Sequence, residues 1–263
     1  MKNQSPDLRR QIALTVSLVV CILGSMIGVG VFGGTPIAEA AGGALAADST
    51  LLAPATPAFS IWSVVYAGLV AFTVWQWLPS QRANPRQRSL GWIVAASMIL
   101  NAAWILSVQA GFLVLSVVVI VALLVTLVLA FLRYSQSRAG SWVEAVVVDG
   151  TLGLYLGWTS VAVCANIAAA LKASGFGGFG LRPEIWSVGV LVVVAVVGIA
   201  LAIKGHGRLA LAAAIAWGLA WITVGRSADA PESFPTALAA AVAAALVLGS
   251  AIAVRARTVL ARR

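Results

Sequence analysis

A stripe of larger and more polar side chains lies within a long apolar run near the middle of the chain. Tyr155, Trp158, Ala162 and Asn166 recur at steps of three and four, so an α-helix places them on one face. Lipid offers no hydrogen-bond partner to a phenol, an indole or an amide. We therefore expect this face to turn toward other protein or a cavity, where it could hold a ligand.

Two shorter groups of the same residue types occur earlier. Trp62 and Tyr66 are four positions apart, and Asn101 and Trp104 are three apart, so a helix places each pair on one face. With a rise of about 1.5 Å per residue, both pairs fall in the outer halves of their expected helices. A few convergent polar groups within apolar walls are typical of small-molecule sites. The same residues equally suit an interfacial aromatic belt and hydrogen bonds between helices.

The composition determines the class of protein. Of 263 residues, 61% are hydrophobic and 10% are charged, and the mean hydropathy is +1.01. This leaves too little polar surface for a soluble globule and predicts an integral protein of the lipid bilayer. The net charge of +9 does not indicate a nucleic-acid partner, because the basic residues stand between apolar runs. Cys21 and Cys164 lie inside such runs, and we interpret them as small core residues.

Eight segments are long enough to cross a hydrocarbon core, which takes about 20 apolar residues. They are approximately 11–33, 57–78, 90–109, 112–132, 143–171, 184–203, 208–225 and 236–254. With the N-terminus inside, only Lys172, Arg182 and Arg226 of the seventeen basic residues fall outside, as the positive-inside rule favours. We predict an all-α protein with both termini cytoplasmic, in a cell membrane such as a bacterial inner membrane.

The first segment has two interpretations. A cleaved signal peptide would explain Arg9 and Arg10 followed by an apolar run, but the run is longer than a signal peptide needs. Gly24 and Gly28 also have the spacing that lets helices pack closely, so we favour a retained helix. Residues 34–56 then form an external loop, too long for a tight connector and long enough to cover a site.

Catalytic residues are sparse. His206 is the only histidine, so no catalytic triad or histidine metal site is expected. Glu144 and Asp149 enter the fifth segment from the cytoplasmic side, and a carboxylate at membrane depth is a functional candidate. Five positions apart, they do not share a helical face well, and Arg133 or Arg138 could pair with them. We favour a structural use, with a membrane enzyme or proton-coupled carrier using Asp149 as the alternative.

The three motifs together resemble the TspO, or translocator-protein, family of tryptophan-rich sensory proteins. The resemblance covers about residues 12–172, and Gly24, Gly28 and Gly30 suit the family's glycine-bearing first helix. It implies a five-helix fold, often dimeric, that binds porphyrins and other tetrapyrroles or sterol-like molecules beneath the first loop. Carried over by position, the ligand-binding residues would be Trp62, Tyr66, Asn101, Trp104, Tyr155, Trp158, Ala162 and Asn166.

We therefore predict a TspO-like five-helix domain over residues 1–172 and an additional three-helix region of unknown role over residues 173–263. Trp217 and Trp221, four apart in the seventh segment, are interpreted as packing residues. The expected function is binding of a hydrophobic small molecule, of porphyrin or haem type or sterol-like, for sensing, transport or disposal. No catalytic or metal-binding residue is assigned, and no cofactor is required.

Overall fold

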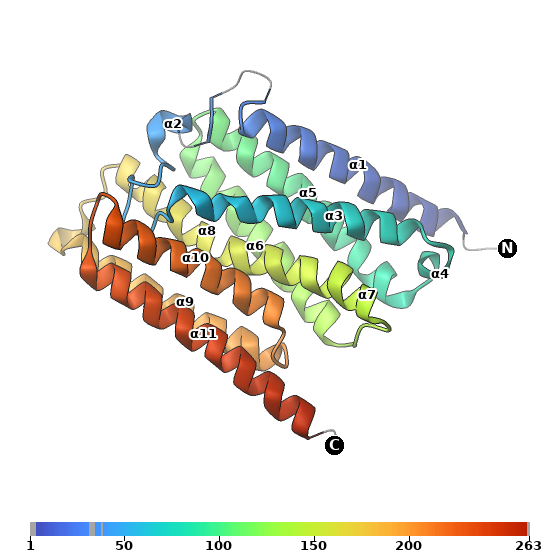
Figure 1. Ribbon diagram of the computed structural model, residues 1–263. Helices are drawn as coiled ribbons and strands as arrows, with labels where there is room; N and C mark the ends of the chain where they lie inside the picture. Colours follow the sequence, from blue (N-terminus) through green and yellow to red (C-terminus); the bar gives the residue numbers. More distant parts are fainter. Residues whose placement is uncertain (1–3, 32–34, 38, 262–263) are drawn as a thin grey trace.

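Long helices run side by side through the whole molecule (Figure 1). The computed structural model describes residues 4–31, 35–37 and 39–261. Its long helices are α1 (Gln4–Gly28), α3 (Ile61–Trp77), α5 (Pro85–Gln109), α6 (Leu113–Ser135), α8 (Thr151–Ala173), α9 (Pro183–Lys204), α10 (Leu209–Ala228) and α11 (Phe234–Leu260). The short elements are α2 (Ala40–Gly43), η1 (Thr56–Ser60), α4 (Pro79–Arg82), α7 (Trp142–Glu144), the π-helical segment η2 (Ala145–Gly150) and η3 (Gly178–Gly180).

Eight of the described helical stretches are long and apolar enough to cross a membrane, which confirms the predicted number. The first of them, Asp7–Gly28, begins and ends earlier than the expected segment 11–33. It ends where Gly30 takes a positive φ of 77°, a conformation that costs glycine little. The fifth, Trp142–Ala173, is the longest because α7, η2 and α8 follow one another without a break.

Side-chain caps and prolines fix where several helices begin. Asn84 accepts a hydrogen bond from the backbone N–H of Arg86, with Pro85 at the first helical position of α5. Ser141 caps α7, and Ser233 caps α11. Such caps satisfy backbone N–H groups that have no partner within the helix.

Glycines allow two close helix contacts. A Cβ atom on Gly28 of α1 would lie 2.0 Å from Cγ1 of Ile105 on α5. On α8, a Cβ atom at Gly157 would lie 2.4 Å from the carbonyl oxygen of Leu211 on α10. The close packing predicted for Gly28 is therefore present. Because α10 packs directly on α8, one hydrophobic core continues from the first five spans into the last three. The division into residues 1–172 and 173–263 remains a prediction.

The beginning of α1 and the end of α11 lie at the same end of the bundle (Figure 1). Eight crossings require this arrangement, which agrees with termini on one side of a membrane. Which side is cytoplasmic remains a prediction from the basic residues.

Candidate ligand-binding site

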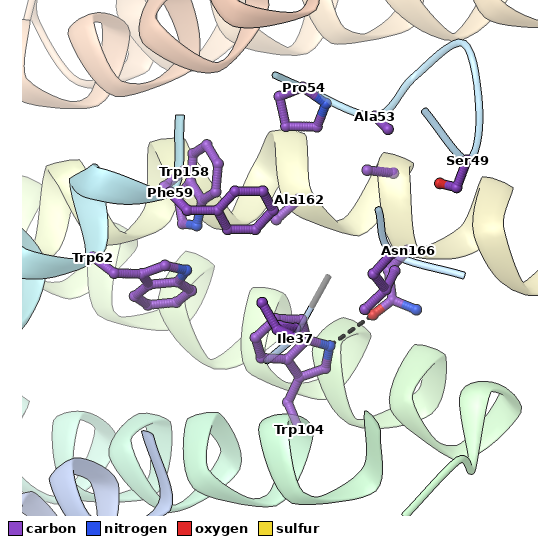
Figure 2. Close-up of a pocket in the computed structure, with 12 residues that line it drawn as sticks. Ile37, Ser49, Ala53, Pro54, Phe59, Trp62, Trp104, Trp158, Ala162 and Asn166 are labelled. Atoms are coloured by element: carbon purple, nitrogen blue, oxygen red, sulfur yellow. Dashed lines mark hydrogen bonds between the residues drawn. The ribbon is translucent and has the colours of Figure 1, made fainter. Parts of the chain in front are cut away.

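A small cavity lies between α3, α5 and α8 and the chain that leads into α3 (Figure 2). We call residues 44–58 the roof segment, because its side chains close the cavity from one side. The cavity has a volume of about 30 Å³. Its lining residues are Ile37, Leu45, Ser49, Ala53, Pro54, Phe59, Trp62, Trp104, Trp158, Ala162, Ala165 and Asn166.

Five of the eight residues predicted to bind a ligand line this cavity. They are Trp62, Trp104, Trp158, Ala162 and Asn166. The structure thus brings together residues from three motifs that are spread over about 100 positions of the sequence. Whether they bind a ligand remains a prediction.

Trp62 lies at the centre of the aromatic cluster. Its ring stacks on that of Tyr66 at a centroid distance of 5.3 Å, and on that of Trp104 at 6.3 Å. The rings of Tyr155 and Trp158 meet it edge to face, at 5.9 and 6.3 Å. Offset-stacked and edge-to-face pairs are the favoured geometries between aromatic rings, so the cluster is held in a defined arrangement.

A hydrogen bond joins two of the predicted motifs within the cavity wall. The indole Nε1 of Trp104 donates to Oδ1 of Asn166 over 2.6 Å (Figure 2). The amide of Asn166 in turn donates to Oγ of Ser116 over 3.0 Å. Trp104 and Asn166 are 6% and 1% exposed, so the amide meets the expectation that buried polar groups are bonded.

The other three predicted residues form a layer behind the cavity wall. The hydroxyl of Tyr66 donates to Oδ1 of Asn101 over 3.1 Å and accepts from Oγ of Ser25 over 2.6 Å. Tyr155 is fully buried, and its hydroxyl donates to the carbonyl of Ser97 over 3.1 Å. These residues position Trp62 and do not themselves line the cavity.

Two fully buried polar atoms of the wall lack a partner among the described residues. They are Nε1 of Trp158, whose side chain is 1% exposed, and Oγ of Ser49. A buried donor without a partner is costly. The described residues therefore leave the hydrogen-bonding capacity of both atoms unused.

Sequence reasoning missed Phe59 and the roof residues that line the cavity. The ring of Phe59 meets that of Trp158 edge to face at 5.6 Å. Its place three positions before Trp62 continues the helical spacing of that motif, and this signal could have revealed it. The roof residues carry no such periodicity, although the prediction that the first loop covers something agrees with their position.

Charged side chains gather at the opposite end of the bundle. Arg86 pairs with Glu144 over 3.1 Å and also with Asp149, and Arg208 pairs with Asp149 through its other carboxylate oxygen. The expected partners, Arg133 and Arg138, were wrong. So was the expectation that the two carboxylates do not share a face. The π-helical segment η2 begins directly after Glu144 and contains Asp149, and its wider turn brings positions five apart to the same side.

The model of the TSPO-like protein family matches residues 11–254. The chain belongs to the TSPO-like protein family. The match extends beyond the predicted 12–172: it covers six of the eight spans completely and most of the first and the last. A search of the curated proteins and a search of the solved structures gave no match.

Members of the TSPO-like family are generally binding proteins rather than enzymes. In the part of this member that the structure describes, no three His, Cys, Asp or Glu side chains stand close enough to hold a metal ion. The carboxylates of the charged cluster are bonded to arginines instead.

Proposed function

We propose that this protein binds a flat, hydrophobic small molecule, a porphyrin-type tetrapyrrole or a sterol-like compound, for sensing, transport or disposal. The observation that carries the proposal is that Trp62, Trp104 and Trp158 come from three helices to surround one cavity. Indole faces stack well on conjugated rings, and the apolar walls suit a ligand that partitions into lipid.

Binding requires the cavity to expand. Pockets for drug-sized ligands enclose about 300–1,000 Å³, whereas this cavity has about 30 Å³. The helices are held by close contacts such as that of Gly157 with Leu211. By contrast, residues 44–55 of the roof segment, which precede η1, have no regular secondary structure. We therefore expect the roof segment, and not the helices, to move when a ligand binds.

Each wall then contributes differently to binding. The rings of Trp62 and Trp158 are nearly perpendicular, at 83°, so a flat ligand that stacks on one meets the edge of the other. The unpartnered Nε1 of Trp158 would donate to a polar substituent of that ligand. The bonded pair of Trp104 and Asn166 would keep the far wall in place.

The alternative use of Asp149, in an enzyme or a proton-coupled carrier, receives less support. Both of its carboxylate oxygens are bonded to guanidinium groups, those of Arg86 and Arg208. With Glu144, the cluster holds two positive and two negative charges. Because both oxygens are already occupied by ion pairs that join different parts of the chain, we propose a structural role for Asp149.

Ligand binding can be tested by the quenching of tryptophan fluorescence in the purified full-length protein. We expect protoporphyrin IX or haemin to quench saturably, and a sterol to compete or to shift the emission. N-acetyltryptophanamide at equal absorbance corrects for light absorption by the ligands. Failure of all three compounds to give a saturable signal would overturn the proposal. We also propose that the protein lies in a cell membrane, as a bacterial inner-membrane protein. The family resemblance further suggests that it forms a homodimer.

A further inference from the structure

The roof segment is bonded mainly to α10, a helix outside the first five spans. Arg226 of α10 donates from Nη2 to the carbonyl of Ala47 over 2.7 Å. The backbone N–H of Ala55 donates to the carbonyl of Trp221 over 3.1 Å. Figure 1 shows the chain between α2 and α3 passing beside one end of α10.

A third bond fixes the end of the roof segment, which lies within η1. Nε1 of Trp217 donates to the carbonyl of Ala58 over 2.9 Å, next to Phe59 in the cavity wall. Trp217 is thus more than the packing residue that the sequence indicated. The backbone of α10 also passes near the roof segment here, because a Cβ atom on Gly225 would be in van der Waals contact with the nitrogen of Ala55, at 3.4 Å.

Arg226 is unusual for a cation near a predicted span end. Its side chain is 1% exposed, and its other terminal nitrogen donates to the carbonyl of Pro231 over 2.9 Å. Among the described residues it forms no ion pair within 4 Å. Its buried charge is compensated by the two backbone carbonyls and by the nearby carboxylates of Asp48 and Asp229. The carbonyl of Ala47 and the carboxylate of Asp48 belong to the roof segment, so the two elements depend on each other.

The pocket-forming helices hold the roof segment less firmly. From α8, Lys172 donates to the carbonyl of Ser49 over 2.6 Å, at an exposed position. An exposed bond competes with water and contributes little. The bonds to Arg226 and Trp217 are more protected from solvent, so they dominate the attachment.

We propose that α10 keeps the roof segment closed over the aromatic cavity, with Arg226 and Trp217 as positioning residues. The additional helices then have a role in binding, because they set how often the cavity opens to a ligand. The inference rests on the proposed function in one respect: opening of the roof segment admits a ligand only if the cavity binds one. The opening itself can be measured without any ligand.

The test measures how often a buried residue of the roof becomes accessible. Ala53 lines the cavity and is 4% exposed, so Ala53→Cys places a thiol on the inner side of the roof. Cys21 and Cys164 are changed to alanine in the same full-length chain. The measured quantity is the rate at which a water-soluble maleimide labels the purified protein in detergent micelles.

Three substitutions are compared in that background. Arg226→Gln should speed labelling by about tenfold or more, because a charge-assisted bond is lost, and Trp217→Phe by about threefold, because a neutral one is lost. Trp221→Phe is the matched control. It removes an indole on the same helix face whose N–H forms no hydrogen bond among the described residues, and it leaves the Trp221 carbonyl in place. It should not change the rate.

Equal labelling rates in Trp217→Phe and Trp221→Phe would overturn the inference, and this comparison decides even if Arg226→Gln does not accumulate. A second arm follows protoporphyrin IX by stopped-flow fluorescence, where association should accelerate by the same factors. If labelling accelerates but the protein and its variants bind neither protoporphyrin IX, haemin nor a sterol, the proposed function fails while the role of α10 stands.

Discussion

At one end of the bundle, tryptophans surround a small apolar cavity, whereas at the other end two arginines and two carboxylates bond to one another across several helices. The aromatic contacts depend on shape, and the buried N–H of Trp158 has no partner among the described residues. The ionic contacts use both oxygens of Asp149. A buried ion pair resists separation because an unpartnered charge is costly. We infer that the charged end fixes the helices, and we propose that the cavity end opens.

The largest expected effect concerns which end faces the cytoplasm. Reporter fusions after residue 263 and within residues 79–89 should report the cytoplasm, and fusions within 34–56 and 172–183 the outside, because fourteen of the seventeen basic residues would then lie inside. The signal is all or none. An external C-terminus would reverse this assignment: the charged end would lie outside, and the cavity would face the cytoplasm.

Arg86→Gln should give the largest loss of stability. It leaves Glu144 and Asp149 each short of a partner, and removal of one member of a buried pair costs about 3–5 kcal/mol of unfolding free energy. Thermal unfolding in detergent measures it. Arg138→Gln is the control, since Arg138 is exposed. Equal melting temperatures in the two variants would show that the charged end does not fix the helices.

Asp149→Asn separates the structural account from the carrier account. The amide keeps the size of the side chain and loses the charge that holds Arg86 and Arg208, so we expect a loss of about 2 kcal/mol in unfolding free energy. Porphyrin affinity should stay nearly intact, since Asp149 does not line the cavity. A carrier that works through Asp149 would instead lose proton-coupled flux in a proteoliposome assay.

The eight spans and part of the cavity wall could be predicted from the sequence, each for a different physical reason. Hydropathy identified the eight spans because lipid requires long apolar helices. Helical spacing identified Trp62, Trp104, Trp158, Ala162 and Asn166, since residues on one helix face share an environment.

Contacts between distant parts of the chain could not be predicted from the sequence. Arg86 and Asp149 are 63 positions apart, and no local pattern states which helices meet. The prediction that Glu144 and Asp149 do not share a face was also wrong, because it assumed 3.6 residues per turn and η2 is π-helical. The attachment of the roof to α10 depends on backbone groups such as the carbonyl of Ala47, which every residue has and which therefore leave no trace in the sequence.

A smaller effect is expected at Asn166. Asn166→Ala removes the acceptor of Trp104 and the donor to Ser116. Interhelical hydrogen bonds in membranes contribute about 0.6 kcal/mol each on average, so the loss of two should cost about 1 kcal/mol of unfolding free energy. The variant should accumulate in the membrane at close to the normal level. Its absence there would mark Asn166 as essential to the fold and weaken its assignment to the ligand site.

The central claim is that the aromatic cavity binds a flat ligand, and substitution of its tryptophans tests this most directly. Trp62→Leu and Trp158→Leu remove ring contacts worth about 0.5–1.5 kcal/mol beyond burial, and so should weaken protoporphyrin IX binding about two- to tenfold. Trp92→Leu, at an exposed residue near the opposite end of α5 from Trp104, should leave the dissociation constant unchanged. Equal effects of all three substitutions, or no effect of any, would contradict the account.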